Sequence, residues 1–437
     1  MRIKDAVILT FWGNEFYRLI LKPFDRYLLD PQPSRTFEPG DLPLNKVCRV
    51  ADSGNGLWRR GYDDLGFPAS PDVFHRKIWE FNQALYGLRT LRRLAPDATA
   101  LGIGCGHEEL MYFLANRIGR VVATDLYEGV YLGGESAADV LAHPAKYAPF
   151  HFREDRLEVR QMNALALQFE AGSFDFVFCL SSLEHFGSED DKLAALREMH
   201  RVLKPGGVAV LTTEIVLNRL GRGSQYFQRE TLTRLIGAAG FSLDGPVDFD
   251  VEQEYSARPL ALPMEAFAVP HVVLRNFHTI YTSIALFLMK PTGPDQVRNA
   301  RVADEVDEPS KPYRYGADIV TVDPPFRVKP GEAIGITITV RNTGDAVWYA
   351  SPSISHMVRL GVWFSTSDGR NITGEPVRIG LPHDVRPDES VTLPVTIDAP
   401  AVQGPGNVQM HIGLVKEQCF WFRDKGCVDH VVSIQDV

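Results

Sequence analysis

The chain combines two patterns of hydrophobic and polar positions. From Ala98 to about residue 290, short apolar runs alternate with segments whose apolar residues recur at helical spacing. We expect strands at 98–104, 120–126, 156–162, 174–181, 207–215, 242–250 and 280–290, with the clearest helices over 190–203 and 231–239. This alternation indicates an α/β fold with a doubly wound parallel sheet. From about residue 316, single apolar and polar residues alternate between turns, which predicts an all-β sandwich.

The segments beside these two regions have no clear period. A helix is predicted to begin near Ser70, Pro71 and Asp72, where proline suits the first turn and the acid suits the helix dipole, and to end near Leu94. The residues in front of it are short pieces interrupted by proline and glycine, which predict a cap. A polar, proline-rich stretch after residue 290 predicts a linker.

Composition limits the classes of function. The chain has 437 residues, which is long for one hydrophobic core, and its 45% hydrophobic and 23% charged residues are typical of a globular protein. Its net charge of −9 argues against a nucleic-acid-binding surface, which is normally basic. Five cysteines are few and odd in number, so we expect free thiols, a reducing compartment and a cytoplasmic protein. Cys419 and Cys427 flank a possible hairpin and could pair. No cysteine or histidine cluster has the spacing of metal ligands.

Two apolar segments raise the question of a membrane. The N-terminal run is too short to span a bilayer, and no small-residue cleavage site follows it. Segment 270–289 is the most apolar long stretch, but it contains His271, Arg275, Asn276 and His278. It therefore predicts a sheet strand, and no transmembrane segment is expected.

A candidate ligand-binding loop follows the first strand of the alternating region. Residues 99–108 read TALGIGCGHE, an apolar strand that leads into closely spaced glycines and then a helix over 108–116. Residues without a Cβ allow a ligand to approach the backbone at a helix N-terminus. The next strand ends in Asp125, about 20 residues beyond the glycines, where a carboxylate can bind ribose hydroxyls. A dinucleotide fingerprint starting at Gly104 requires glycine at position 109, which is Glu109, so a nicotinamide enzyme is disfavoured.

Four further segments follow at regular distances: QMNA at 161–164, SFDFVF at 173–178, LSSLEHF at 180–186 and LREMHRVLKPGG at 196–207. Together with the loop they resemble class I S-adenosylmethionine-dependent methyltransferases of the small-molecule, type 11-like kind, over roughly residues 75–290. The resemblance implies S-adenosyl-L-methionine as cofactor. It also implies a Rossmann-like, seven-stranded sheet whose last strand is antiparallel. The last segment predicts a helix with Lys204 in its final turn.

The resemblance implies cofactor-binding roles for Gly102, Gly104, Gly106, Glu108, Asp125, Leu126, Asn163, Ala164, Leu180 and Ser181. Among these, Asp125 corresponds to the ribose-binding acid, and Asn163 and Ala164 correspond to the turn on the adenine side.

Two residues of the loop depart from the family. Gly102 stands where the family has an acid that helps to hold the cofactor's ammonium, and Glu108 stands where a further glycine is usual. Glu108 either substitutes for that acid or complements the helix dipole in solvent. The departures leave open an alternative, a non-catalytic glycan-binding or scaffold protein with a degenerate methyltransferase domain.

His185 and Glu214 are the candidate catalytic residues. Methyl transfer to a hydroxyl depends on positioning and benefits from a general base. His185 follows the fourth strand, and its alternative role is to cap or pack that turn. Glu214 lies at the end of the fifth strand, where it could act as a base or bind substrate. The long segment 127–155 is predicted to shape substrate access.

Four residues outside this pair are weaker candidates. His271 follows a proline, and its alternative role is to cap a loop. His75, Arg76 and Trp79 are predicted to lie on a solvated helix face with one core aromatic. Residues 323–326, DPPF, fit a signature of enzymes that methylate nucleic-acid bases, but they lie beyond the linker, so we interpret them as a turn.

Segments of the last third (VKPGE at 328–332, VRNTGDAVW at 340–348 and FWF at 420–422) resemble the immunoglobulin-like domains appended to polysaccharide export transporters. In that family such domains recognise the terminal sugars of a glycan. The resemblance implies possible glycan contact through Trp348, Trp363, Trp421 and Phe422, although core packing is the default for aromatic residues in a sandwich.

The sequence therefore predicts a methyltransferase that acts on a hydroxyl of a saccharide or another hydroxylated small molecule in glycan assembly. Its partners are a small-molecule or glycan acceptor, and no nucleic acid. The predicted segments are an N-terminal cap at 1–74, a methyltransferase domain at 75–290, a linker at 291–315 and an immunoglobulin-like sandwich at 316–437.

Overall fold

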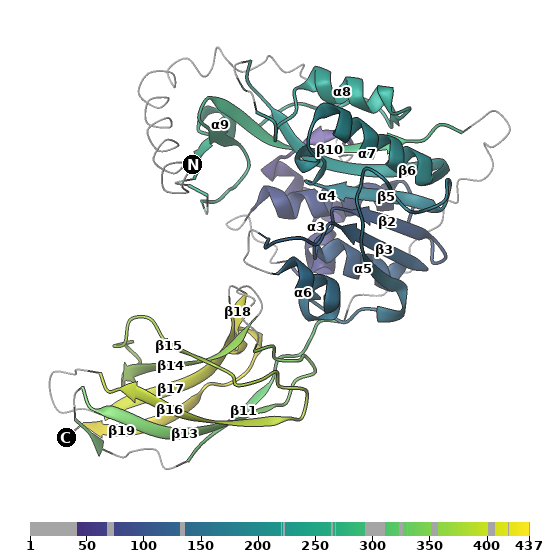
Figure 1. Ribbon diagram of the computed structural model, residues 1–437. Helices are drawn as coiled ribbons and strands as arrows, with labels where there is room; N and C mark the ends of the chain where they lie inside the picture. Colours follow the sequence, from purple (N-terminus) through teal and green to yellow (C-terminus); the bar gives the residue numbers. More distant parts are fainter. Residues whose placement is uncertain are drawn as a thin grey trace. The chain divides into compact units, whose positions relative to one another are not determined.

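Figure 1 shows a computed structural model of the chain. The structure describes residues 42–67, 74–131, 136–219, 221, 223–263, 265–266, 268–292, 311–322, 327–329, 331–350, 357–400, 407–417 and 419–436. Contacts divide the chain into two units, Met1–Tyr127 with Ala148–Ser310, and Glu128–Tyr147 with Lys311–Val437. The DPPF turn and most of the predicted cap and linker lie outside the described residues. The predicted boundaries at 74, 290 and 315 stay predictions.

A mixed sheet forms the centre of the first unit. Five parallel strands are neighbours in the order β4 (Leu157–Gln161), β3 (Arg120–Asp125), β2 (Thr99–Ile103), β5 (Phe174–Leu180) and β6 (Leu203–Val216). Antiparallel β10 (Thr279–Met289) follows β6, so the apolar segment near residue 280 is a strand, as predicted. The sheet also contains β9 (Leu274–Asn276), β8 (Leu260–Ala261), β7 (Ser242–Leu243) and β1 (Lys46–Val47), which makes ten strands among the described residues. The predicted Rossmann-like fold is thus confirmed, with three strands more than the seven implied.

The helices of the first unit form two groups. One contains α3 (Gly56–Leu65), α4 (Arg76–Thr90) and α5 (Glu109–Arg117), which contact one another. The other contains α7 (Glu189–Val202) and α8 (Arg229–Ala238). Figure 1 draws α7 and α8 in front of the sheet and α3 and α4 behind it. Short elements are η3 (Val50–Gly54), η6 (Glu154–Arg156), η7 (Leu183–His185) and α9 (Gln253–Ala257).

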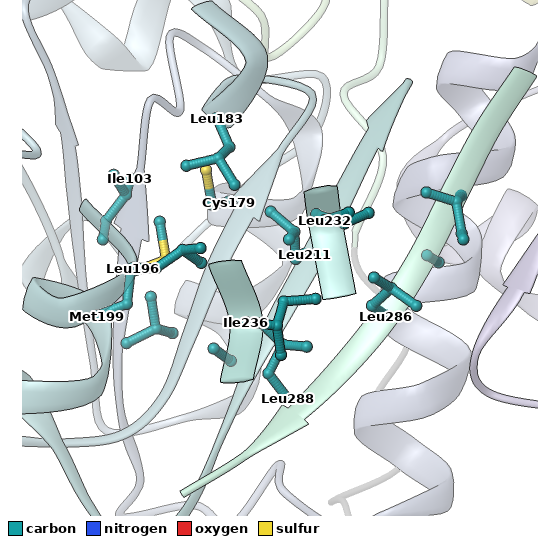
Figure 2. Packing of buried hydrophobic residues seen from close by; sticks show 14 of the residues in the cluster. Ile103, Cys179, Leu183, Leu196, Met199, Leu211, Leu232, Ile236, Leu286 and Leu288 are labelled. Atoms are coloured by element: carbon teal, nitrogen blue, oxygen red, sulfur yellow. The ribbon is translucent and has the colours of Figure 1, made fainter. Parts of the chain in front are cut away.

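The core of the first unit lies between the sheet and these helices. Parallel strands covered on both faces are apolar along their whole length, and in β5 every residue except Asp175 is buried. Figure 2 shows Leu196 and Met199 of α7 in one cluster with Ile103, Leu211 and other strand residues. Fully burying each such side chain stabilises the fold by roughly 1.5–3 kcal/mol. The cluster therefore holds the strand ends that carry the predicted site in fixed positions.

The second unit consists of two sheets that share one core. The smaller is antiparallel, with the order β11 (Ala317–Val322), β13 (Ala333–Asn342) and β16 (Ser390–Asp398). The larger has the order β12 (Arg327–Val328), β19 (His430–Asp436), β17 (Asn407–Lys416), β14 (Val358–Thr366) and β15 (Val377–Gly380), with β18 (Phe420–Trp421) beside β17 and η8 (Phe422–Lys425) after it. Its pairs are antiparallel except β12 with β19. Strict alternation of buried and exposed residues along β16 follows from the period of a strand. The unit also includes α6 (Ala137–Ala142) and η5 (Pro144–Tyr147).

Three predicted elements differ from the structure. The predicted strand at 242–250 is only Ser242–Leu243, because Gly245 adopts a φ of +86° and Pro246 has no N–H to donate. Helix α4 begins at Arg76 rather than near residue 70, after His75, whose Nδ1 accepts the N–H of Lys77 at 3.2 Å. Helix α7 ends at Val202, so Lys204 belongs to β6, where its ammonium lies 2.8 Å from Asp175.

None of the helices in the part of the chain that the structure describes is long and apolar enough to cross a bilayer. All five cysteines are free thiols, and those at 48, 105 and 179 are buried.

Candidate functional site

The glycine loop lies between the carboxyl end of β2 and α5. Gly104 and Gly106 adopt φ angles of +68° and +49°, which favour glycine. The N–H of Gly104 donates to the carbonyl of Thr124 at 2.8 Å. A Cβ at Gly104 would lie 2.5 Å from the Cβ of Ser182, so this glycine is also required by a close approach. The conformation of the loop therefore requires glycine at both positions, and its backbone at Gly104 packs against Ser182.

Asp125, the last residue of β3, supports this loop. Its Oδ2 accepts the N–H of Gly106 at 2.9 Å, and the hydroxyl of Tyr127 donates to the carbonyl of Gly106 at 3.0 Å. Asp125 is only partly buried, and Leu126 after it is 49% exposed. A carboxylate has about four acceptor positions, so Asp125 can accept further hydroxyl donors.

The other predicted cofactor residues follow neighbouring strands. Asn163 comes after β4, where its Oδ1 accepts the N–H of Leu165 at 2.9 Å and forms the turn that contains Ala164. Leu180 ends β5, and Ser181 after it adopts a φ of +47°. The carboxyl ends of parallel strands meet at one edge of a sheet. The structure therefore brings these residues to the same edge as Asp125.

The turn after β5 contacts both the loop and α4. The hydroxyl of Ser182 donates to the carbonyl of Gly104 at 2.8 Å. The hydroxyl of Ser181 donates to Oε2 of Glu80, a fully buried residue of α4. The two serines thus fix the loop and the helix to the same strand end.

Gly102 and Glu108 occupy unusual surroundings. A Cβ at Gly102 would lie 2.1 Å from Cys105 Sγ and 2.5 Å from Phe178 Cζ, so this position has no room for a side chain. Glu108 is the residue before α5, but its side chain makes no capping hydrogen bond. Its Oε2 is buried and, among the described residues, has no hydrogen-bond partner. Burial raises the pKa of the Glu108 carboxyl well above its usual range, and Lys77 opposes that rise.

Glu214 near the end of β6 is held by two cations of α4. Its Oε1 lies 2.8 Å from Nη1 of Arg76 and 3.5 Å from Nζ of Lys77. Burial acts to raise the pKa of Glu214, but a hydrogen bond from Glu184 and the charges of Lys77 and Arg76 outweigh it and lower the pKa to about 2. Glu214 is therefore ionised at neutral pH.

Glu184, which the sequence did not single out, faces Glu214 from the turn after β5. Its side chain is buried, and its Oε2 accepts the hydroxyl of Thr213 at 2.8 Å. Burial, followed by the hydrogen bond to Glu214 and the charge of that residue, raises the pKa of Glu184 well above its usual range. The opposite directions of the two pKa shifts favour a protonated Glu184 beside an ionised Glu214. An acid in the turn after one strand, opposite an acid near the end of the neighbouring parallel strand, is the signal that could have identified the pair.

Helix α4 does not present the solvated face that the sequence predicted for it. Arg76 is 8% exposed and Glu80 is fully buried, because Arg76 lies 3.1 Å from Oε1 of Glu80 and also binds Glu214. Glu80 further accepts the hydroxyls of Ser283 and, at 3.1 Å, of Thr212. A charged residue can be buried where such pairing compensates for its lost hydration. The sequence alone did not reveal these partners.

His185, the predicted base, lies at the end of η7 and is exposed. Burial of part of the ring lowers the pKa of His185. The charge of Glu214 raises this pKa but does not outweigh burial, so the imidazole is neutral at pH 7. A neutral imidazole can accept a proton.

A pair of histidines lies beside Arg76. The rings of His75 and His271 stack with centroids 4.1 Å apart, and burial lowers their pKa values to about 3 and 4. His271 Nδ1 is buried and, among the described residues, has no hydrogen-bond partner. On the other side of Arg76, Tyr226 contacts Tyr281 with ring centroids 4.4 Å apart. The Arg76 guanidinium thus lies 5.9 Å from the ring of Tyr281 as well as beside its two carboxylate partners.

The four aromatic candidates of the second unit occupy two environments. Trp348 and Phe422 are buried in the core between the two sheets, with ring centroids 5.5 Å apart. Trp363 and Trp421 lie outside that core and contact each other at 5.3 Å, with Arg423 over both rings. Trp363 is nevertheless buried, at 8% exposure, and its ring stacks on that of His411, so packing within the protein accounts for three of the four residues and Trp421 is half-buried.

Comparison with known proteins identifies the family of the chain. The family model described as "Methyltransferase domain" matches residues 101–211. A ubiquinone biosynthesis O-methyltransferase of Xanthomonas campestris pv. campestris (strain B100) is 34% identical over 195 residues, which are 44% of this chain and 67% of that protein. The chain belongs to the class I S-adenosylmethionine-dependent methyltransferases.

Other relatives of this methyltransferase are matched over shorter parts. A demethylmenaquinone methyltransferase of Lactococcus lactis is 34% identical, over 29% of this chain and 46% of that protein. The chain spans 61% of an O-methyltransferase of Pseudomonas paraeruginosa and 13% of a tRNA methyltransferase of Xenopus tropicalis. A geranyl diphosphate C-methyltransferase of Streptomyces coelicolor A3(2), solved with S-adenosyl-L-homocysteine, has 19% identity over 52% of this chain and 84% of that one, with a TM-score of 0.36.

S-adenosyl-L-methionine is the cofactor of this methyltransferase. The site fits that group, because Asp125 offers a carboxylate to ribose hydroxyls and Glu108 has a buried oxygen without a donor among the described residues. When bound, the cofactor would supply an electrophilic methyl group.

Proposed function

We propose that this methyltransferase methylates a hydroxyl of a saccharide or another hydroxylated small molecule in glycan assembly, in the cytoplasm. The observation that carries the proposal is the paired carboxyls of Glu184 and Glu214 at the ends of β5 and β6, with Arg76 beside them. We propose that the ten residues assigned above from the family resemblance bind the cofactor and that His185 and Glu214 act on the acceptor.

The polar atoms near Arg76 favour an acceptor with several hydroxyls. Arg76 Nε, His271 Nδ1 and Asn276 Oδ1 are buried without hydrogen-bond partners among the described residues. An unsatisfied buried polar atom costs about 1–3 kcal/mol, and a ligand that pairs with it removes this cost. A hydroxyl both donates and accepts, so a polyol can satisfy an arginine N–H and an amide oxygen alike. The two relatives named for quinone biosynthesis show that the family also takes other acceptors.

His185 and Glu214 have different proposed roles. His185 is neutral at pH 7, so it accepts the acceptor's hydroxyl proton while the oxygen lone pair bonds to the methyl carbon and the C–S electron pair leaves with sulfur. Glu214 stays ionised and accepts a hydrogen bond from a neighbouring hydroxyl, which orients the acceptor.

The second unit gives the proposal its link to glycans. Its two sheets, one shared core and the VRNTGDAVW segment support an immunoglobulin-like domain similar to those of polysaccharide export transporters. We propose glycan contact through Trp421, which lies outside the core and is half-buried, whereas Trp363 is buried and stacked on His411. Aromatic faces of this kind stack on sugar rings.

A radiolabelled methyl-transfer assay on separated lysate fractions tests the function. We expect label in the lipid-linked glycan fraction and none in RNA. Label in the small-metabolite fraction alone would move the acceptor away from glycans. Wild-type protein that binds the cofactor product but labels no fraction would favour the alternative, a non-catalytic glycan-binding scaffold.

Replacing the predicted base gives a sharper test. His185→Gln should lower kcat by about 10²–10⁴-fold, because the acceptor hydroxyl loses its proton acceptor. The affinity for S-adenosyl-L-homocysteine should stay unchanged. His383→Gln, at a 55% exposed histidine of the second unit, is the matched control and should keep full activity. Equal kcat in His185→Gln and wild type would remove His185 from the mechanism.

A further inference from the structure

The amino-acid end of the cofactor is a zwitterion, so its pocket must provide an acceptor for an ammonium group and a cation for a carboxylate. We propose that Glu108 binds the ammonium group and that Lys77 binds the carboxylate. This inference rests on the cofactor and not on the identity of the methyl acceptor.

The first step concerns the free oxygen of Glu108. Glu108 lies between the glycine loop and α5 and makes no capping hydrogen bond with the helix. Its Oε2 is removed from solvent, and no donor among the described residues reaches it. A buried carboxylate oxygen without a donor destabilises a protein unless a ligand supplies the donor. An ammonium group with three N–H donors supplies it.

The second step places Glu108 at the end of β2. The charge of Glu108 is the largest electrostatic contribution that raises the pKa of Cys105, after burial. Cys105 Sγ occupies the space that a Cβ at Gly102 would need. The carboxyl of Glu108 therefore acts on the region beside Gly102, where no side chain of residue 102 itself can fit.

The third step concerns Lys77. Its Nζ lies 3.7 Å from Glu80 Oε2 and 3.5 Å from Glu214 Oε1, which are both ion-pair distances. The shorter one is at the upper end of hydrogen bonding, and the longer one is beyond it. The side chain is 37% exposed, so its ammonium retains donors for a ligand. Glu80 accepts the hydroxyl of Ser181, and Ser182 donates to Gly104, so these contacts connect Lys77 to the loop.

The charges around Glu108 support the same pairing. Lys77 is the first charged group that lowers the pKa of the Glu108 carboxyl, whereas Glu109, Glu80 and Asp125 raise it. Glu108 thus lies among three acids and one cation, and a ligand ammonium would relieve the repulsion between the acids. Lys77 would at the same time gain the ligand carboxylate.

Calorimetry with two ligands tests the proposal. S-adenosyl-L-homocysteine carries the amino-acid end, and 5′-methylthioadenosine lacks it. Glu108→Gln and Lys77→Met should each bind S-adenosyl-L-homocysteine about 10- to 100-fold more weakly, because each loses a charge-assisted hydrogen bond. Both should bind 5′-methylthioadenosine as wild type does. Circular dichroism and a thermal melt establish that each variant is folded.

Matched controls are available on the same elements. Glu109→Gln removes a carboxyl one residue along α5, and Lys204→Met removes an ammonium group at the other end of the sheet, where it pairs with Asp175. Both controls should keep wild-type affinity for the two ligands. Wild-type affinity of Glu108→Gln for S-adenosyl-L-homocysteine, or an equal loss for both ligands, would overturn the role of Glu108. If Lys77→Met changed only the KM for the acceptor and not the affinity for S-adenosyl-L-homocysteine, the role of Lys77 would be overturned. Failure of wild type to bind S-adenosyl-L-homocysteine would contradict the cofactor itself.

Discussion

At the scale of single residues, the site depends on two glutamates that are buried for different reasons. Glu184 has partners within the protein, because its Oε2 accepts the hydroxyl of Thr213 and its carboxyl faces that of Glu214, although its Oε1 has no hydrogen-bond partner among the described residues. Glu108 has an oxygen that no described residue satisfies. A carboxyl that protein groups hold serves mainly the scaffold, whereas a carboxyl for which the described residues provide no donor indicates where a ligand binds. The two residues should therefore respond differently to ligand and to pH.

The affinity for S-adenosyl-L-homocysteine should rise with pH through the titration of Glu108. Burial raises the pKa of this carboxyl; the acids Glu109, Glu80 and Asp125 raise it further, and Lys77 lowers it. At acid pH the carboxyl is therefore neutral and a poor partner for an ammonium group. Deprotonation restores the charge and strengthens binding. In the free protein the sign is opposite: unfolding becomes easier as pH rises, because the unfolded chain ionises Glu108 at a lower pH than the folded chain. Calorimetry between about pH 5 and pH 8 measures the first effect.

Glu108→Gln provides the control for this pH dependence. Its affinity for S-adenosyl-L-homocysteine should be weak and should no longer rise with pH. In Glu109→Gln the affinity should still rise with pH, but at lower pH, because the charge of Glu109 no longer raises the pKa of Glu108. A wild-type slope in Glu108→Gln would assign the titration to another group.

At the scale of elements, α4 is the helix that joins the cofactor side of the site to the acceptor side. Glu80 fixes it to the ends of β5, β6 and β10 through Ser181, Thr212 and Ser283. Arg76, one turn earlier, extends the same network to Glu214. The positions of Lys77 and Arg76 therefore depend on Glu80, which itself contacts no ligand in this scheme.

Glu80→Ala should destabilise the first unit by about 3–5 kcal/mol, because it removes one partner of a buried ion pair and leaves Arg76 and three hydroxyls short of an acceptor. Urea unfolding followed by circular dichroism measures the change. The comparison is Glu189→Ala on α7, where the glutamate and Arg234 are both 58% exposed and the pair should contribute about 0–1 kcal/mol. A similar small loss in both variants would show that the Glu80 network carries no stability.

These elements also show what sequence can reveal. Strands β2, β3, β5 and β6 were predicted because central parallel strands are largely apolar, and β4 because its apolar and polar residues alternate. Gly104, Asp125 and Glu214 were found because they lie at or near the ends of such strands. The role of α4 was missed, since Arg76 and Glu80 have the polarity of a solvated face and their partners come from distant strands. Glu184 was missed for a related reason: its pairing with Glu214 depends on how two strand ends meet, which no local pattern encodes.

At the scale of the whole molecule, the chain has two separate hydrophobic cores. The first lies between the mixed sheet and its helices, and the second lies between the two sheets of the second unit. Residues that share one hydrophobic core unfold together, so two units with separate cores can unfold independently. The division also separates the proposed methyl-transfer site from the proposed glycan contact.

Differential scanning calorimetry should therefore resolve two transitions, each sensitive to its own core. Leu211→Ala in β6 should lower only the first unit's transition, and Ile412→Ala in β17 only that of the second, because each removes a buried side chain at a cost of about 2–5 kcal/mol. S-adenosyl-L-homocysteine at about 100 times its Kd should stabilise the transition sensitive to Leu211→Ala by roughly 2.7 kcal/mol and leave the other unchanged. One transition that both substitutions and the ligand shift together would contradict independent units. It would instead mean that cofactor binding and the second unit are thermodynamically coupled.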